Sequence, residues 1–370
     1  MDNKTKVKVA VVIAIVVLAV IFILMVVFVK GNRTQVNQNI PRKGTDSYVE
    51  PSTNTSVDIG NEDENVSSGE PITSDGIVSI GMKGTDLVAI NSNLESTVIK
   101  KIGSKYSSFC YGDNKIYTVL DNGEENDSIN EIDLLKGDYP EKTILTTTGD
   151  YGAIKNVEYY AGKLYFVSER MELVEYSIDE NVMKPLANEN EVSNFTIDKA
   201  NNRIYVSYRP NGTNPGVYVL DLTANTFTQI ITLNDLPGQL ILHGNSLIID
   251  VKEYQRLYVY HIEQNTVLEL GADNLLEEAK NQITFYEDVL LYTNGTTIDI
   301  KNANGDSYQD GWYTVEDGSI ASIAMLDATK LQIARFDGTG KVSQSSVVDL
   351  TTGTITQMPD IVYSDVVTIK

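Results

Sequence analysis

The 370-residue sequence predicts an all-β fold: a β-propeller of seven four-stranded blades, preceded by one transmembrane helix and a disordered stalk. Two observations predict this organisation. A strand-rich unit repeats along the chain from about residue 76, and an uncharged apolar run lies near the N-terminus. A repeat of about 40–45 residues is typical of a four-stranded propeller blade.

The repeating unit is a turn followed by a strand in which apolar side chains alternate with polar ones. Its aligned apolar positions are spaced by 48, 40, 43, 43 and 41 residues. These positions are Ile116, Leu164, Ile204, Leu247, Leu290 and Leu331. An apolar strand precedes each unit and a hairpin rich in Val, Ile, Tyr and Thr follows it. Each unit therefore supplies four strands, which we name A to D from the axis outward.

The two ends of the repeat predict how the ring closes. Leu87 precedes Ile116 by 29 residues, which matches the distance from a C strand to the next B strand elsewhere in the chain. Leu87 thus belongs to a C strand and residues 77–81 to its B strand, without an A strand before them. Residues 361–369 supply a spare strand, so we expect a closing blade that combines the last strand with the first three. Six blades are the alternative if one repeat is an insertion, and a two-sheet sandwich would not produce this period.

The apolar run covers residues 9–29 and contains no charged side chain. A helix of about 20 apolar residues spans the roughly 30 Å hydrocarbon core of a bilayer. Lys4, Lys6 and Lys8 precede the run, which predicts a cytoplasmic N-terminus. No small-x-small cleavage site follows, so the pattern favours an uncleaved anchor over a cleaved signal peptide.

The predicted organisation is a cytoplasmic tail (1–8), a transmembrane helix (9–29), a disordered acidic linker (30–75) and an extracellular propeller domain (76–370). The linker has no periodic apolar pattern, and residues 45–75 contain eight acidic and no basic side chains. Such a segment cannot bury enough apolar surface to offset its chain entropy. We therefore expect a single-pass cell-membrane protein whose C-terminal domain lies outside the cell.

Charge and cysteine content limit the possible partners. The formal net charge of −22 disfavours nucleic acid and anionic lipid, because their phosphates would be repelled. Cys110 is the only cysteine, so no internal disulfide can form. This combination fits an exported bacterial protein with a large core.

The sequence contains no motif that specifies a reaction, and it predicts no catalytic residue, cofactor or metal. His243 and His261 are the only histidines, and both are interpreted as strand or turn residues. The G-x-S-x-G, H-E-x-x-H and C-x-x-C patterns are absent. Calcium is the alternative left open, since residues 302–310 contain oxygen ligands at calcium-loop spacing. Position 12 of that loop would be Tyr313 instead of a bidentate glutamate.

Arginines mark a candidate ligand-binding face. The propeller domain has five arginines, and four of them fall in predicted B–C loops of different blades. The candidate residues are Arg170, Arg209, Arg256 and Arg335, with Tyr208 and Tyr254 beside two of them. The planar guanidinium suits carboxylate and phosphate groups, so this face would bind an anionic glycan or peptide. Solvated loop charges are the alternative, because the four arginines occupy different positions relative to their strands.

The repeated hairpins carry a resemblance to a known family. Segments such as GVYVLDLTANTFTQI (216–230) and SSVVDLTTGTITQM (345–358) resemble bacterial extracellular β-propellers, in particular low-density-lipoprotein-receptor-related-protein-like propellers. The resemblance implies a surface-exposed propeller without an assigned reaction. The Y-W-T-D signature of the receptor propellers is absent, since Trp312 is the only tryptophan, so no ligand-binding residue is transferred.

Together these features predict a membrane-anchored binding or scaffolding module at the bacterial cell surface. Its partners would be the membrane, through the N-terminal helix, and an extracellular protein or an anionic glycan or peptide. The alternative is a cell-surface hydrolase or lyase that acts on wall or glycan substrates through carboxylates near the propeller axis.

We predict that protease added to intact cells removes the propeller and leaves a short membrane-held stub. The apolar run and the lysines before it are the reason for this N-in, C-out topology. Immunoblotting of tags at the two ends measures it. A mature N-terminus located beyond residue 29 would contradict the anchor.

Overall fold

A computed structural model of the chain describes most of residues 77–369. The gaps are residues 104–105, 124–125, 188–190, 211–212, 235, 252–255, 271–282, 288, 303–307, 316–317, 337–341 and 360–361. The predicted tail, membrane anchor and linker lie outside the described residues. Within the described part of the chain, no helix is long and apolar enough to cross a bilayer.

The described residues form seven four-stranded antiparallel sheets. The innermost (A) strands are β4 (Tyr106–Gly112), β8 (Lys155–Tyr160), β12 (Glu191–Asp198), β16 (Gln239–His243), β20 (Ile283–Tyr286), β24 (Ser319–Met325) and β28 (Tyr363–Thr368). The B strands are β1 (Ile77–Lys83), β5 (Lys115–Asp121), β9 (Lys163–Val167), β13 (Arg203–Arg209), β17 (Ser246–Val251), β21 (Val289–Asn294) and β25 (Lys330–Phe336).

The two outer strands of each sheet follow in the same order. The C strands are β2 (Asp86–Asn91), β6 (Asp127–Asp133), β10 (Leu173–Ser177), β14 (Gly216–Asp221), β18 (Arg256–His261), β22 (Thr297–Asn302) and β26 (Val342–Asp349). The D strands are β3 (Ser96–Lys101), β7 (Glu141–Thr146), β11 (Val182–Pro185), β15 (Thr226–Thr232), β19 (Thr266–Glu269), β23 (Tyr308–Thr314) and β27 (Ile355–Pro359). A short 3-10 helix, Gly149–Tyr151, precedes β8.

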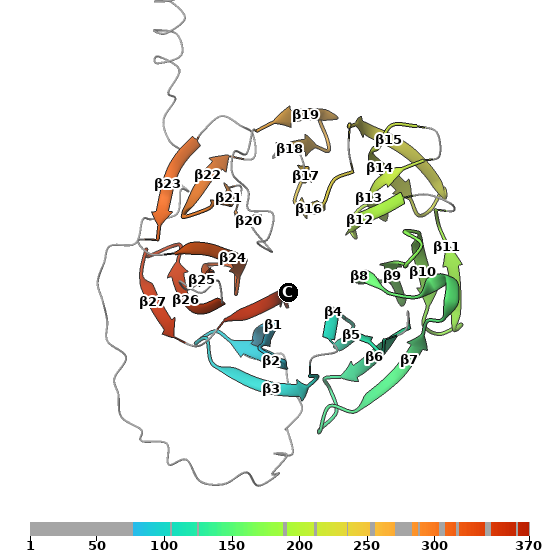
Figure 1. The fold of residues 1–370 in the computed structure, drawn as a ribbon, viewed down its shortest axis with the longest axis horizontal. Helices are drawn as coiled ribbons and strands as arrows, with labels where there is room; N and C mark the ends of the chain where they lie inside the picture. The colour runs from blue at the N-terminus through green and yellow to red at the C-terminus, as the bar shows by residue number, and fades with distance from the viewer. Residues whose placement is uncertain are drawn as a thin grey trace, which may run out of the picture. The chain divides into compact units, whose positions relative to one another are not determined.

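The sheets are arranged as the blades of a ring (Figure 1), so the predicted seven-bladed propeller is confirmed. Blades 1 to 6 follow the chain from β4 to β27. Blade 7 has the strand order β28-β1-β2-β3 and thus joins the red C-terminal strand to the blue N-terminal strands. The predicted mixed closing blade is therefore also confirmed.

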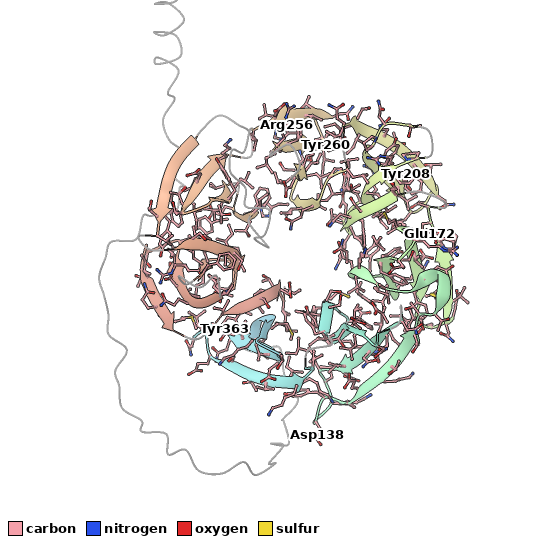
Figure 2. All side chains as sticks on the ribbon, in the orientation of Figure 1. Asp138, Glu172, Tyr208, Arg256, Tyr260 and Tyr363 are labelled. Atoms are coloured by element: carbon pink, nitrogen blue, oxygen red, sulfur yellow. The ribbon has the colours of Figure 1, made fainter. Side chains whose placement is uncertain are left out.

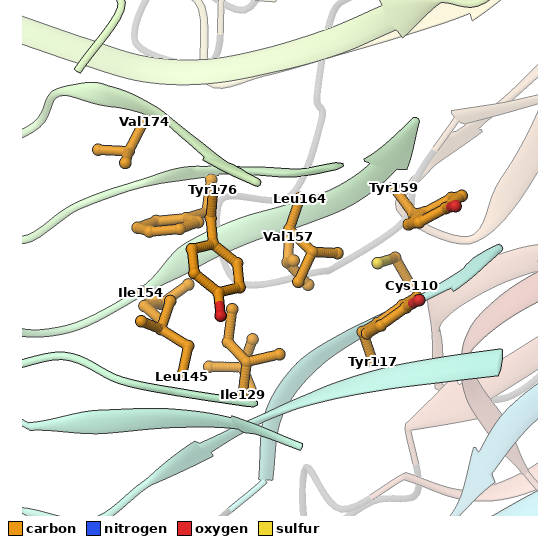
Figure 3. Close-up of a cluster of buried hydrophobic side chains, with 12 residues drawn as sticks. Cys110, Tyr117, Ile129, Leu145, Ile154, Val157, Tyr159, Leu164, Val174 and Tyr176 are labelled. Carbon is orange, nitrogen blue, oxygen red and sulfur yellow. The ribbon is translucent and has the colours of Figure 1, made fainter. Parts of the chain in front are cut away.

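The hydrophobic core is divided among the spaces between blades. Six clusters of buried residues each join two neighbouring blades in the described structure. Between blades 1 and 2, the rings of Tyr117 and Tyr159 stack with centroids 5.3 Å apart, and Cys110 lies beside them (Figure 3). Both faces of a B strand therefore meet apolar neighbours, which explains why Val, Ile, Leu and Tyr dominate these strands.

Strand β28 closes the ring through several contacts. It pairs with β1 through Ile80 and Val367, and it also contacts β24 of blade 6 and β4 of blade 1. The buried Gln332 of blade 6 donates from Nε2 to the carbonyl oxygen of Tyr363 at 2.6 Å. Its Oε1 accepts from the Tyr363 N–H at 3.0 Å. The amide of Gln332 thus satisfies both backbone groups of the first residue of β28.

The inner strands are less regular than their apolar patterns predict. The register shifts once in five of them, β4, β8, β12, β24 and β28. In β28, Asp365 and Val366 together oppose one residue of β1, and Asp365 has φ 50°. In β8, Asn156 and Val157 do the same opposite β9, and Asn156 has φ 51°. Asp and Asn tolerate this left-handed backbone better than other non-glycine residues.

We predict that deletion of residues 361–370 unfolds the propeller or lowers its melting temperature strongly. The deletion removes the A strand of blade 7 and exposes the edge of β1, together with apolar surface of blades 6 and 1. Circular dichroism melting of the full chain and the truncated chain in detergent measures the effect.

Substitution of Gln332 by Leu tests the same closure without truncation. It leaves the buried N–H and C=O of Tyr363 unpaired, and we expect a loss on the order of 3 kcal/mol in the free energy of unfolding. Gln344→Leu on the exposed part of β26 is the matched control. Equal stability of all four chains would contradict this account of ring closure.

Candidate functional site

The B–C loops carry the predicted arginines at one end of the blades. Arg170 lies in the turn between β9 and β10, Arg209 ends β13 and Arg256 begins β18. Because neighbouring strands are antiparallel, these positions in blades 2, 3 and 4 share one end of the ring. Arg335 lies near the corresponding end of β25 in blade 6, separated from the others by blade 5.

Several of these arginines have polar partners in their own blades. Arg209 Nη1 donates to Glu191 Oε2 at 2.5 Å, and Arg256 Nη1 lies 3.7 Å from Glu269 Oε1. Arg335 Nη2 donates to Gln357 Oε1 at 3.4 Å, and its Nε is buried. These three contacts run within single blades, and a shared ligand site for the arginines stays a prediction.

Of the two tyrosines predicted for the site, the structure describes Tyr208 and not Tyr254. Tyr208 is only 8% exposed, and its ring packs edge-on against Tyr218 with centroids 5.1 Å apart. It belongs to the hydrophobic cluster between blades 2 and 3. Figure 2 shows Tyr208 and Arg256 on neighbouring blades, away from the centre of the ring. Tyr254 lies outside the described residues, as does most of the calcium-type loop 302–310.

A cavity of about 400 Å³ lies among the inner strands and was not predicted. Residues of β4, β16, β20, β24 and β28 line it. Its lining combines apolar residues such as Ile241 and Val366 with polar residues such as Ser108 and Thr284. Cavities of this size with a few convergent polar groups are typical ligand sites. The sequence signal that could have found it is the set of polar residues within otherwise apolar inner strands.

The charged group of this cavity comes from the closing strand. Asp365 Oδ2 accepts a hydrogen bond from the hydroxyl of Tyr106 at 3.3 Å, which joins β28 to β4 across the blade 7–blade 1 boundary. Burial, followed by the nearby Asp365 carboxylate, raises the pKa of the Tyr106 phenol. The phenol therefore stays neutral and acts as a donor at physiological pH.

A second carboxyl group lies where blades 1, 2 and 3 meet. Glu158 of β8 accepts a hydrogen bond from the Ile197 N–H of β12 through Oε2 at 3.3 Å. Burial raises the pKa of Glu158 to about 7, and this hydrogen bond and Lys199 partly oppose the shift. Burial and the neighbouring Glu158 also raise the pKa of the Cys110 thiol, so this cysteine is a packing residue and a poor nucleophile.

The described part of the chain contains no cluster of side chains that could bind a metal ion. No group of three or more His, Cys, Asp or Glu side chains lies close enough there to hold an ion. His243 instead stacks on Phe285 with centroids 4.3 Å apart, and its Nε2 lies 2.6 Å from the Glu287 carbonyl oxygen. This histidine therefore joins blade 4 to blade 5.

Comparisons with known proteins support the fold alone. No protein-family model matches the chain, and no curated protein matches it. The computationally designed Ika8 protein is similar with 12% identity and a TM-score of 0.51, over 79% of this chain and 88% of that chain. A nidogen/laminin complex is similar with 14% identity and a TM-score of 0.47, over 64% and 92%. An oligogalacturonate lyase in complex with manganese is similar with 12% identity and a TM-score of 0.47, over 57% of this chain and 68% of that chain.

The similarity to the designed protein is consistent with a β-propeller, which is the class of protein that the seven blades define. The three similarities do not establish the low-density-lipoprotein-receptor-related-protein-like family to which the hairpins show a resemblance. At such identities, a shared fold carries no information about a shared ligand.

We predict that the free energy of unfolding falls as the pH rises from about 4.5 to about 7, because of Glu158. Folding raises the pKa of this carboxyl from its ordinary value of 4.5 to about 7. The folded state therefore binds more protons than the unfolded state between these two pH values. Chemical denaturation at several pH values measures the slope. Glu158→Gln should reduce this slope, whereas the exposed Glu180→Gln should leave it unchanged. An unaltered slope in Glu158→Gln would contradict the assignment.

Proposed function

We propose that the chain is a membrane-anchored binding or scaffolding module on the outer surface of a bacterial cell. Residues 9–29 would hold it in the membrane, and the acidic linker 30–75 would act as a flexible stalk. The propeller would then present its loop-bearing ends to extracellular partners. Its ligand would be an anionic glycan or an acidic peptide segment of another protein.

The observation that supports this proposal is the position of three arginines on consecutive blades. Arg170, Arg209 and Arg256 lie at the same end of blades 2, 3 and 4. The side chains of Arg209 and Arg256 are 36% and 52% exposed, and their acidic partners are also exposed. Exposed ion pairs contribute only about 0–1 kcal/mol, so a ligand carboxylate or sulfate can replace Glu191 or Glu269 at little cost.

The test is binding of the full chain, in nonionic detergent, to arrays of anionic and neutral glycans and of peptides. We expect binding to an anionic ligand that falls by roughly tenfold or more when Arg170, Arg209 and Arg256 are all changed to Ser, because three guanidinium contacts are lost. The melting temperature should change little.

The matched control changes three cations at the opposite ends of blades 1, 2 and 3. Lys115, Lys163 and Arg203 begin their B strands, so their replacement by Ser gives the same change in net charge on the other face. Equal losses in the two triple variants would mean that only long-range charge matters. The proposal that the arginine face is the binding site would be wrong in that case. It would also be wrong if the variant of Arg170, Arg209 and Arg256 bound the ligand as strongly as the unchanged chain.

A surface hydrolase or lyase is the second candidate function, and Glu158 is the observation that favours it. A carboxyl group with a pKa of about 7 is suited to general acid or base catalysis near neutral pH. Cleavage of an array glycan by the unchanged chain but not by Glu158→Gln would support this function over simple binding.

A further inference from the structure

We propose that the axial cavity binds a small organic cation, whose ammonium group contacts Asp365 and whose apolar part lies against the inner strands. This site is separate from the arginine-bearing loops and takes a ligand of opposite charge. The proposal therefore stands whether or not the arginine face binds an anion.

The lining of the cavity suits an amphipathic ligand. Half-buried residues such as Ile241, Ala324 and Val366 supply apolar surface from three inner strands. Asp365 is the one charged side chain among the described residues that line the cavity. A ligand that fills this space thus needs an apolar body and a single cationic group, because an anion would meet a carboxylate and no basic partner.

The carboxylate of Asp365 has an incomplete set of partners. Its Oδ2 accepts from the neutral hydroxyl of Tyr106, and no Lys or Arg of the described residues forms an ion pair with it. A partly buried carboxylate without a cation is unfavourable, so an ammonium group at Oδ1 would stabilise the site. Ser108 is another residue of the cavity lining, and its Oγ is buried without a hydrogen-bond partner in the described structure.

The backbone at this position needs a short polar side chain and does not need a charge. Asp365 has φ 50° where two residues of β28 oppose one of β1. The equivalent residue of blade 2 is Asn156, with φ 51° at the same kind of register shift. An amide side chain thus serves this bulge equally well. The bulge therefore does not require the negative charge of Asp365, which is available for binding a ligand. Bulges commonly change the direction in which a side chain points.

Two further features favour a cation. Tyr106 and Phe109, with ring centroids 6.3 Å apart, are both lining residues, and the half-buried ring of Tyr106 can contact an ammonium through its π face. The net charge of −22 also raises the local concentration of cations around the propeller and lowers that of anions.

The test compares three probes of similar shape by titration calorimetry with the full chain in nonionic detergent. The probes are 2-phenylethylamine, the neutral 2-phenylethanol and the anionic 3-phenylpropionate. We expect saturable one-to-one binding of the amine in the millimolar range or tighter, and roughly tenfold weaker binding of the other two. Asp365→Asn should remove the preference for the amine over the alcohol. The variant should keep the fold, because Asn156 has the same backbone conformation at the equivalent position of blade 2.

Asp138→Asn is the matched control. Asp138 is exposed in the C–D loop of blade 1, has φ 62°, and its change removes the same single negative charge. Ala324→Phe is a second variant that fills the cavity from β24 and should weaken binding of the amine and the alcohol alike. Absent amine binding, equal losses in Asp365→Asn and Asp138→Asn, or unchanged binding in Ala324→Phe would each overturn the proposal. The triple arginine variant should bind the amine normally, which separates this site from the arginine face.

Discussion

The pairing of β28 with β1 joins the two ends of the propeller, and the rest of the ring depends on it. Strand β28 contacts its own blade, blade 6 and blade 1 at once. Without it, β1 would present unpaired N–H and C=O groups, and the apolar clusters on both sides of blade 7 would face water. Gln332 secures the start of this strand, because its buried amide bonds both backbone groups of Tyr363.

A closed ring of this kind places its hydrophobic core between blades and leaves the axis to the inner strands. Each cluster is shared by two blades, as in the contact of Tyr117 with Tyr159, so blades stabilise one another in sequence around the ring. Five of the inner strands have a register shift, as do outer strands such as β3, β7 and β15. Polar groups such as Asp365 and Glu158 can therefore lie near the axis without interrupting a continuous apolar core.

The charged groups of the propeller fall into two kinds of environment. Arg209 and Arg256 lie at exposed blade ends beside acidic partners, where water screens each pair and exchange is easy. Asp365 and Glu158 lie among inner strands, where the Tyr106 hydroxyl and the Ile197 N–H respectively donate hydrogen bonds to them. The first kind suits recognition of large, exposed partners. The second suits a small ligand or a proton, because each interaction there is stronger and more selective.

The sequence by itself predicted the four-stranded blades and the mixed closing blade, and it favoured seven blades over six, which the structure confirms. Alternating apolar residues such as Ile116 and Leu331 mark the B strands, and the 29-residue offset of Leu87 locates the missing A strand. These properties follow from strand periodicity and chain spacing, which are local. Only the tertiary structure decided that Tyr208 is buried between blades, that Asp365 lines an axial cavity and that Glu158 has a raised pKa. Those properties arise from contacts between different blades, and burial and electrostatic fields depend on such contacts and not on local pattern.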